Sequence, residues 1–443
     1  MVLKFNDDNI ISNLSFYYNY VKLCVFLIYI KIFNMLNYKE KLYDCIYQLC
    51  LFGGPIFIKI AQNISNKEMI DYSLRKRLIK FQDNNFDYCK NSYDSNYLIE
   101  KYNLDSISEK PLFAGSIAAV YKCKYKNKNS VLKIIHPNIK YNTIMSINLF
   151  DKLVSNINMA NYNLNQIISM NDLYQEVLNQ IDFNLEYKNL IKIKENFKDF
   201  NNLVIIPEVY HHNTEFLIES FEDGYKFTEF IKLYPEKSQE AYYLLCCCFF
   251  KMFFDNYVHV DFHESNLRFI LDNNKVKIII FDFGMVSKIH DKKIYLSLLN
   301  IYKKNIFLAD PYKLVDLFIK LNTNSNCDIK KFKQNIYDYI QNENIDENLN
   351  TIINEKVYQN DKTQNLNTYN VIKYIIDQAI LLELKICDTI FNMLNSFILI
   401  EDFFIKIENR NPNSYKSHQE KMKYAQDNGF INDIKKSFSK TLN

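Results

Sequence analysis

Apolar residues recur every three or four positions over residues 10–80, the spacing that places them on one face of an α-helix. The recurrence is clearest at Leu36, Leu42, Ile46, Leu49, Phe57 and Ile60. Gly53, Gly54 and Pro55 interrupt it, and these residue types end and begin helices. We therefore expect helices on both sides of this break.

From residue 111 the spacing changes to the alternation that is typical of β-strands. Val120–Tyr125 and Val131–Ile135 are rich in β-branched and aromatic residues, and a polar Lys/Asn turn separates them. The pattern predicts a two-stranded hairpin. Helical spacing returns over residues 142–200, and the short apolar runs 204–206 and 216–219 predict a further pair of strands.

The second half of the chain reads as mainly helical. Asp223-Gly224 predicts a turn, and a lobe boundary is expected near Gly224. The apolar runs 267–271 and 276–281 enclose Asp272-Asn273-Asn274, which predicts a second hairpin. Residues 341–368 are polar and Asn-rich, so we expect a long surface loop there. Residues 411–443 are polar and Lys-rich, which predicts a weakly ordered tail.

Composition and charge narrow the class of protein. The chain has 443 residues, of which 48% are hydrophobic, enough to bury a full core. Its 54 Lys and Arg nearly balance 51 Asp and Glu, and the two signs alternate along the chain. Because no basic block stands out, we expect no nucleic-acid partner.

The ten cysteines form no CxxC pair and no Cys/His spacing suited to zinc. We therefore expect a reducing intracellular compartment. Cys246, Cys247 and Cys248 lie inside the apolar stretch 242–254, where we expect buried core thiols.

The N-terminal residues predict no secretory signal or transit peptide, because Asp7 and Asp8 are acidic and no Arg precedes Arg75. The most apolar window, Leu23–Ile30, is shorter than the roughly 20 residues of a spanning helix. An amphipathic helix is expected, either packed into the core or peripheral on a membrane surface.

Acidic and amide side chains follow one another in the order that phosphoryl transfer requires. Asp261 follows His259 by two residues, Asn266 comes five residues later, and Asp282-Phe283-Gly284 follows the second predicted hairpin. In kinases one carboxylate orients the attacking hydroxyl, while a second carboxylate and an amide oxygen hold Mg²⁺ on the phosphates. The pattern gives the first role to Asp261 and the second to Asn266 and Asp282.

A phosphate site is indicated upstream. Ala114, Gly115 and Ser116 form a small-residue loop whose backbone can approach phosphates, and Lys133 lies on the second strand of the following hairpin. A lysine in an apolar strand requires an anionic partner, because an unpaired buried ammonium is costly. Glu186 is the predicted partner; the alternative is that it is an ordinary solvated helix carboxylate.

Together these motifs resemble the UbiB, or aarF-type, family of atypical kinases. Residues 52–62 resemble its Lys-x-Gly-Gln segment, with Lys59 and Gln62 in place and Ala61 where the family has Gly. Residues 111–121 resemble its Ala-rich loop, and residues 180–186 its Glu-x-Asp element and helix glutamate, with Gln180 in place of Glu. Residues 259–266 and 282–284 resemble its catalytic and metal segments, and Glu264-Ser265 replaces the usual Pro-Gly.

The resemblance, from about residue 40 to 410, implies an α+β, atypical protein-kinase-like fold: a small β-containing N-lobe, a mostly helical C-lobe and family-specific N-terminal helices. It divides the chain into five segments. These are an N-terminal amphipathic extension (1–38), a helical segment carrying Lys59 and Gln62 over the active site (39–105), an N-lobe with a helical insertion (106–224), a C-lobe (225–410) and a tail (411–443).

The implied function is binding of ATP and Mg²⁺, with ATP hydrolysis or phosphoryl transfer linked to ubiquinone biosynthesis or lipid homeostasis. Lys133 and Glu186 would set the phosphates, and Lys59 with Gln62 would restrict access for bulky protein substrates. Two other classes stay open: a catalytically silent nucleotide-binding scaffold, and a membrane-associated structural or lipid-handling protein. A homodimer and an unidentified protein partner are left open as well.

Overall fold

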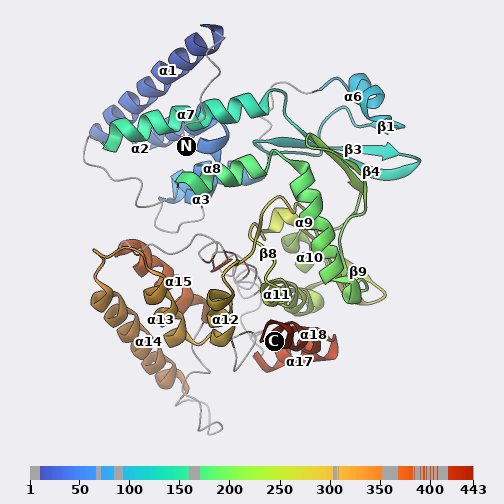
Figure 1. Ribbon diagram of the computed structural model, residues 1–443, viewed down its shortest axis with the longest axis vertical. Coiled ribbons are helices and arrows are strands. Elements are labelled where there is room, and N and C mark those ends of the chain that lie inside the picture. Colours follow the sequence, from blue (N-terminus) through green and yellow to red (C-terminus); the bar gives the residue numbers. More distant parts are fainter. Residues whose placement is uncertain are drawn as a thin grey trace. The chain divides into compact units, whose positions relative to one another are not determined.

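The computed structural model describes residues 10–65, 71–83, 93–158, 170–302, 307, 309–351, 368–382 and 418–442, with single residues between 384 and 407. The chain divides into two compact units, Met1–Asn189 with Pro207–Glu222, and Leu190–Ile206 with Asp223–Asn443 (Figure 1). The chain passes from the first unit to the second for the last time between Glu222 and Asp223, beside Gly224. Residues 190–206 fall inside the predicted segment 106–224 but belong to the second unit; the five-segment division remains a prediction.

The expected N-terminal helices are confirmed, and the break between two of them has a clear physical basis. The helices are α1 (Ile10–Met35), α2 (Lys39–Gly53), α3 (Pro55–Ser65), α4 (Tyr72–Leu78) and α5 (Lys80–Asp83). A Cβ on Gly53 would lie 2.3 Å from the Phe57 ring, so only glycine fits there. Ser146 donates to the Gly53 carbonyl (2.6 Å) and accepts from the Ile56 amide (3.2 Å), which satisfies backbone groups that the break leaves without helical partners.

Helix α1 is apolar on two sides. Leu23 is fully buried, and Tyr20 and Leu27 pack on the same core. Val21 and Ile28 are exposed on another side of the helix. Within the described part of the chain, none of the helices combines the length and the apolar composition of a membrane-spanning segment.

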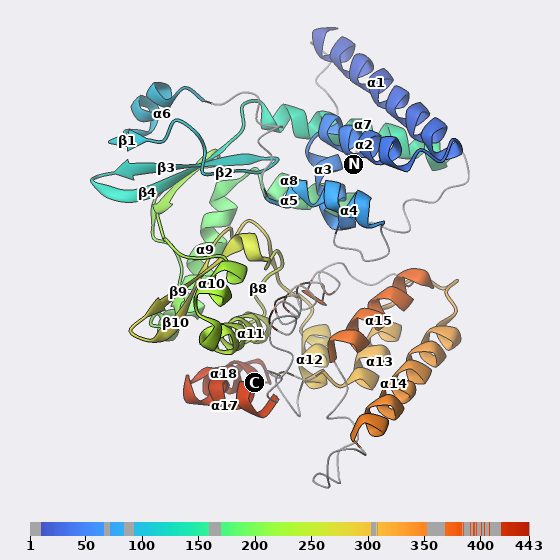
Figure 2. The same cartoon turned by 180° about the vertical axis from the view of Figure 1, so that it is seen from behind.

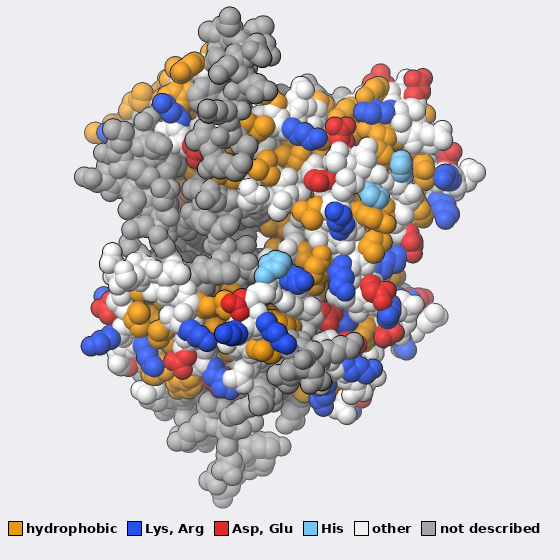
Figure 3. All heavy atoms as spheres, in the orientation of Figure 1, with side chains coloured by type: hydrophobic (Ala, Val, Ile, Leu, Met, Phe, Trp, Pro, Cys, Tyr) orange, Lys and Arg blue, Asp and Glu red, His pale blue; other side chains and the backbone are white. Residues whose placement is uncertain are grey.

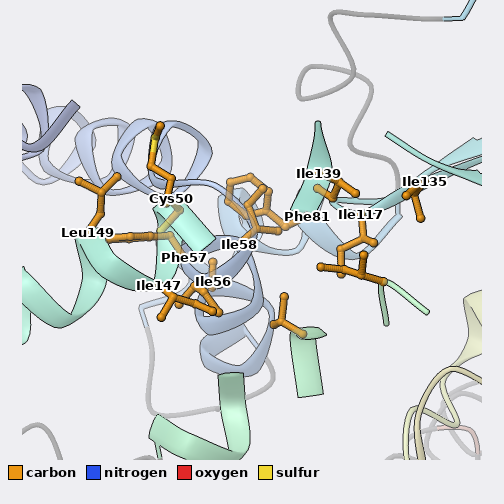
Figure 4. Packing of buried hydrophobic residues seen from close by; sticks show 14 of the residues in the cluster. Cys50, Ile56, Phe57, Ile58, Phe81, Ile117, Ile135, Ile139, Ile147 and Leu149 are labelled. Carbon is orange, nitrogen blue, oxygen red and sulfur yellow. The ribbon is translucent and has the colours of Figure 1, made fainter. Parts of the chain in front are cut away.

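The core of the first unit joins α3 to helices α7 (Ile139–Asn158) and α8 (Met170–Asn179) and to the sheet. Figure 4 shows Ile56, Phe57 and Ile58 of α3 close to Ile147 of α7, with Ile117 and Ile135 toward the strands. Phe183, at the start of α9 (Phe183–Asn196), belongs to the same cluster. The helical segment and the strands of this unit therefore share one core.

The sheet of the first unit has the order β1-β3-β4-β7-β6, with β2 paired to β3, and its pairs are antiparallel. Its strands are β1 (Ser106–Ile107), β2 (Phe113–Ala114), β3 (Ala118–Tyr125), β4 (Lys128–Ile135), β6 (Val209–His212) and β7 (Phe216–Ser220), and α6 (Ser95–Tyr102) precedes them. The first predicted hairpin, β3–β4, is confirmed. Lys126 and Asn127 close it with φ of 50° and 62°, the conformation of a two-residue hairpin turn.

The runs 204–206 and 216–219 both form strands, as predicted, but the two strands lie in different sheets. Strand β5 (Val204–Ile205) pairs in parallel with β10 (Lys275–Ile280) of the second unit, whereas β7 pairs with β4 and with the unpredicted β6. Short apolar runs indicate strands but do not carry the identity of their partners. The second hairpin, β9 (Leu267–Asp272) with β10, is confirmed, with Asn273 and Asn274 at positive φ.

The second unit is mostly helical. Besides the sheet β5-β10-β9 it has a small pair, β8 (Val258–His259) with β11 (Val286–Ser287). Its helices include α10 (Phe227–Leu233), α11 (Ser238–Phe254), α12 (Lys292–Ile301), α13 (Pro311–Leu321) and α15 (Thr368–Leu381). Helix α11 is buried on nearly every side, so Cys246, Cys247 and Cys248 are core thiols, as predicted.

Part of the predicted loop at 341–368 is helical instead. Helix α14 (Ile329–Thr351) continues through residues 341–351, and α15 begins at Thr368; residues 352–367 lie outside the described residues. Phe332, Ile336 and Ile340 are fully buried and hold the first turns of α14. Polar residues can extend a helix that such packing has already nucleated.

The predicted weakly ordered tail is wrong for most of its length. Residues 418–442 form α17 (His418–Asp427) and α18 (Phe430–Leu442), both packed on α11 (Figures 1 and 2). Phe430 is fully buried, and its ring stacks on that of Phe200 with the ring centroids 4.2 Å apart. Asp433 forms an ion pair with Lys251. A few well-spaced apolar residues in polar surroundings produce this docking. Residues 411–417 lie outside the described part.

On the face in Figure 3, Lys and Arg side chains are interspersed with Asp and Glu over the described surface. This agrees with the alternation of charge along the sequence.

Phe430→Ala should lower the free energy of unfolding by about 3–5 kcal/mol, because it leaves a cavity against Phe200. Denaturant unfolding followed by circular dichroism measures this. Lys435→Ala, on an exposed position of the same helix, should change it by less than about 0.5 kcal/mol. Equal small effects of both substitutions would mean that α18 is not docked.

Candidate active site

In the first unit, Lys133 and Glu186 form a buried ion pair. Lys133 lies on β4 and Glu186 in the first turn of α9, and Lys133 Nζ lies 2.8 Å from both carboxylate oxygens. Their side chains are 13% and 5% exposed. Removing one partner from such a pair leaves an uncompensated charge in the interior, so each residue needs the other. The structure therefore places the predicted lysine beside its predicted partner.

The first turn of α9 is fixed from several sides. Phe183 is buried, and its amide donates to the Thr214 carbonyl (3.3 Å). The His212 ring, on β6, stacks on Tyr187 with ring centroids 3.7 Å apart, and its Nδ1 lies 3.0 Å from Asn184 Oδ1. Since these contacts flank Glu186, they hold its carboxylate toward Lys133.

The small-residue loop is held by a histidine that sequence reasoning did not select. Ala114 ends β2, and the Gly115 amide donates to the Ala118 carbonyl (2.8 Å). His136 Nε2 lies 2.8 Å from the Gly115 carbonyl, and the His136 amide donates to the Ile117 carbonyl (2.8 Å). His136 thus clamps the loop around Ser116 to the end of β4. The signal in the sequence was the position of His136, three residues after Lys133 and directly after the strand that carries it.

Burial lowers the pKa of His136 below its usual 6.5, although the hydrogen bond to the Gly115 carbonyl partly offsets this. The ring is therefore neutral at pH 7, and its Nε2 proton is the one that can reach the carbonyl.

Lys59 and Gln62 lie three residues apart on α3. Lys59 is buried, and Gln62 Nε2 donates to the Phe81 carbonyl (2.7 Å). Ile58 and Ala61 of the same helix belong to the cluster that contains Ile117 of the loop. The same core thus packs against both the helix that carries Lys59 and Gln62 and the residue that follows the small-residue loop.

In the second unit, a buried histidine joins the catalytic-loop and Asp-Phe-Gly segments. His259 is fully buried; its Nδ1 accepts from the Asp261 amide (3.2 Å), and its Nε2 lies 3.0 Å from the Phe281 carbonyl. Burial lowers its pKa, so the ring is neutral and carries its proton on Nε2. His259 occurs in the recognised motif, but its bridging role could not be read from spacing.

Asp261 and Asn266 are held together within this loop. Asn266 Nδ2 donates to the Asp261 carbonyl (2.9 Å), and the Phe281 amide donates to the Asn266 carbonyl (3.0 Å). The Asp261 carboxylate lies 3.3 Å from His263 Nε2, and its side chain is 32% exposed. The backbone of Asp261 is therefore fixed while its carboxylate can still reach a reactant.

Asp282 adopts a left-handed backbone with φ of 58°. Such a conformation costs of order 1–3 kcal/mol in a non-glycine residue, and aspartate tolerates it better than most. The Gly284 amide lies 3.4 Å from Asp282 Oδ1. The strained backbone thus belongs to a carboxylate in a predicted metal position.

A carboxylate and an amide oxygen suit Mg²⁺, which prefers oxygen ligands and usually keeps several waters. Because Nδ2 of Asn266 already donates to Asp261, its Oδ1 is the acceptor that remains for a cation. No cluster of three or more His, Cys, Asp or Glu suited to a metal occurs among the described residues. Because Mg²⁺ prefers octahedral coordination by oxygen, phosphate or water oxygens would complete its shell beside Asn266 and Asp282.

The predicted residues thus fall into two groups. The first unit holds the loop Ala114–Ser116, Lys133 with Glu186, and Lys59 with Gln62. The second unit holds the catalytic and metal candidates, Asp261, Asn266 and Asp282. The functional roles of all these residues remain predictions.

Residues 94–314 match the sequence profile of the ABC1 atypical kinase-like domain. A relative from Dictyostelium discoideum, "Probable serine/threonine-protein kinase abkC", is 28% identical over 52% of this chain and 35% of its own length. "Probable protein kinase UbiB" of Shewanella piezotolerans is 25% identical over 63% of this chain and 54% of its own length. The chain thus spans about a third to a half of these curated relatives.

Among the solved structures that match is the complex of Rv3197 with erythromycin from Mycobacterium tuberculosis. Its sequence is 14% identical, the alignment covers 74% of this chain and 86% of that chain, and the TM-score is 0.42.

Acidification should destabilise the protein in part through His136. Unfolded histidine titrates near 6.5, so below that pH the unfolded state binds a proton that native His136 does not. The contribution of His136 to the free energy of unfolding is complete above about pH 6.5. It is lost as the pH falls, at up to about 1.4 kcal/mol per pH unit.

Unfolding free energies between pH 5 and 7 test this in the wild type and in His136→Gln, whose amide can still donate to Gly115. The variant should show a shallower pH dependence; equal slopes in both proteins would contradict the assignment.

Proposed function

The chain carries an ABC1 atypical kinase-like domain and belongs to that family, and on this premise we propose that it binds ATP with Mg²⁺ and transfers or hydrolyses the terminal phosphoryl group. The observation that carries the proposal is the buried Lys133–Glu186 pair in a unit that also holds a clamped small-residue loop. In the second unit, the segments joined by His259 supply a candidate base, Asp261, and two candidate Mg²⁺ ligands, Asn266 and Asp282.

In the proposed mechanism, Lys133 contacts phosphate oxygens as a point charge, and Glu186 fixes the direction of its ammonium group. The backbone of Ala114–Ser116 approaches the phosphates while His136 keeps the loop in place. Asn266 and Asp282 offer oxygen ligands to Mg²⁺, which neutralises charge on the phosphates when it is bound.

Asp261 acts on the attacking hydroxyl of water or of an acceptor. Its carboxylate accepts the hydroxyl proton as the new oxygen–phosphorus bond forms, and ADP leaves with the electrons of the broken bond. The hydrogen bonds from both sides of its backbone keep this carboxylate oriented.

We propose a small molecule or a lipid, or water alone, as the phosphoryl acceptor. Support comes from the resemblance of the Lys59–Gln62 segment to one that restricts bulky protein substrates in the UbiB family. A link to ubiquinone or lipid metabolism rests on the same resemblance.

A nucleotide-binding scaffold without turnover is the second candidate. It is favoured by Gln180, which stands between α8 and α9 in place of the family's glutamate. Binding without hydrolysis would select this candidate.

A Mg-nucleotide at about 100 times its dissociation constant should stabilise the native state by about 2.7 kcal/mol. Asp282→Asn should reduce this gain, because it removes a charged metal ligand. Thermal unfolding with nucleotide, with and without Mg²⁺, measures both effects. Asp272→Asn, a matched substitution of a half-exposed carboxylate on β9, should keep the full shift. No shift with any nucleotide in the wild type would contradict the proposal.

Asp261→Asn should lower ATP hydrolysis by about 100-fold or more while nucleotide binding persists, because general-base catalysis typically contributes that much. Steady-state hydrolysis of purified protein tests this. An unchanged rate in the variant would remove Asp261 from the mechanism.

A further inference from the structure

Glu264 lies inside the catalytic loop yet has no part in the proposed chemistry. Its Oε1 accepts a hydrogen bond of 2.6 Å from the backbone amide of Thr228. Thr228 is the second residue of α10, and amides in a first helical turn have no partner inside their helix. A carboxylate that accepts from such an amide forms a strong, charge-assisted bond.

Thr228 belongs to a segment that is tightly fixed within the second unit. Tyr225 and Phe269 exchange two backbone hydrogen bonds, of 3.0 and 2.8 Å. A Cβ on Gly224 would lie 2.9 Å from the Cβ of Arg268, so this segment lies directly against β9. It also follows the point at which the chain enters the second unit, after Glu222. Glu264 therefore ties the catalytic loop to a rigid support.

From Glu264, a short series of contacts leads to Asp261. Glu264 begins the single 3₁₀ turn Glu264–Asn266, and Asn266 donates through Nδ2 to the Asp261 carbonyl (2.9 Å). Arg268 Nη1 donates to the Ser265 carbonyl (3.1 Å), which holds the other side of this turn. A displacement of Glu264 would therefore move Asn266 and, through it, Asp261.

We infer that Glu264 is a positioning residue: its hydrogen bond to the Thr228 amide anchors the catalytic loop on α10 and keeps Asp261 and Asn266 in place. At this position the UbiB family has proline, whose ring restricts the backbone directly. Here a side-chain hydrogen bond supplies the restriction. The catalytic part of the inference rests on the proposed function; the anchoring does not.

The simpler explanation is that Glu264 merely caps α10. Glu229 provides a matched control, since its Oε2 accepts from the Lys226 amide (3.1 Å) at the same end of the same helix. Glu229 lies within α10, outside the catalytic loop. If Glu264 only caps α10, Glu264→Ala and Glu229→Ala should have similar effects on hydrogen exchange. If Glu264 anchors the catalytic loop, only Glu264→Ala should change exchange in that loop.

Hydrogen exchange of the full chain without nucleotide separates these explanations. Glu264→Ala should speed exchange at the Asn266 and Phe281 amides by about tenfold or more, because a hydrogen bond to a charged acceptor is lost. In Glu264→Gln, which keeps an oxygen acceptor, the exchange rates of these amides should stay closer to those of the wild type. Glu229→Ala should affect α10 only. Unchanged loop exchange in Glu264→Ala, or equal loop exchange in Glu229→Ala, would overturn the inference.

Kinetics test the catalytic part. Glu264→Ala should lower kcat for ATP hydrolysis about tenfold with KM for Mg-ATP within about twofold, and Glu264→Gln should recover most of the loss. An unaltered kcat in Glu264→Ala would overturn the positioning role. If the wild type itself did not hydrolyse ATP, the proposed function would fail, and hydrogen exchange would still decide whether Glu264 anchors the loop.

Discussion

The buried ion pair between Lys133 and Glu186 is the constraint on which the first unit depends. Two charges removed from water are tolerated only when each finds its partner with good geometry, and both oxygens of Glu186 lie 2.8 Å from the ammonium. The pair therefore fixes the first turn of α9 against β4. The stacking of His212 on Tyr187 and the burial of Phe183 keep that turn in the same place. An ammonium held in this way is suited to contact phosphates in a defined direction.

Both units use a buried, neutral histidine to hold a loop. His136 binds the Gly115 carbonyl in the first unit, and His259 joins Asp261 to Phe281 in the second. Burial lowers the pKa of each ring, so each keeps one donor and one acceptor nitrogen near neutral pH. A neutral ring can bridge two backbone groups without bringing a further charge close to the residues proposed to bind phosphate and Mg²⁺. Neither histidine touches the reactants in the proposed mechanism, yet both determine where the loops lie.

Spacing along the chain selects Lys133, Asp261, Asn266 and Asp282 as candidates, because phosphoryl transfer restricts the order of such residues. Their roles remain predictions. Hairpins were also predictable, since alternation and Asn-rich turns are local signals. The strand that pairs with β5 was not predictable, because its parallel pairing with β10 depends on contacts between residues distant in sequence. Helix α18 was missed since a few residues, Phe430 above all, dock it amid polar neighbours. The roles of His136 and Glu264 depend on backbone partners that no spacing reveals.

The proposed function depends above all on one property, the binding of a Mg-nucleotide by this chain. The most direct test is amide hydrogen exchange of the wild-type chain over a titration with Mg-ATP. Bound nucleotide is expected to slow exchange around Gly115 and around Asn266 and Asp282, and this protection should saturate as the nucleotide concentration rises. Exchange that stays unchanged in these segments at every nucleotide concentration would contradict it.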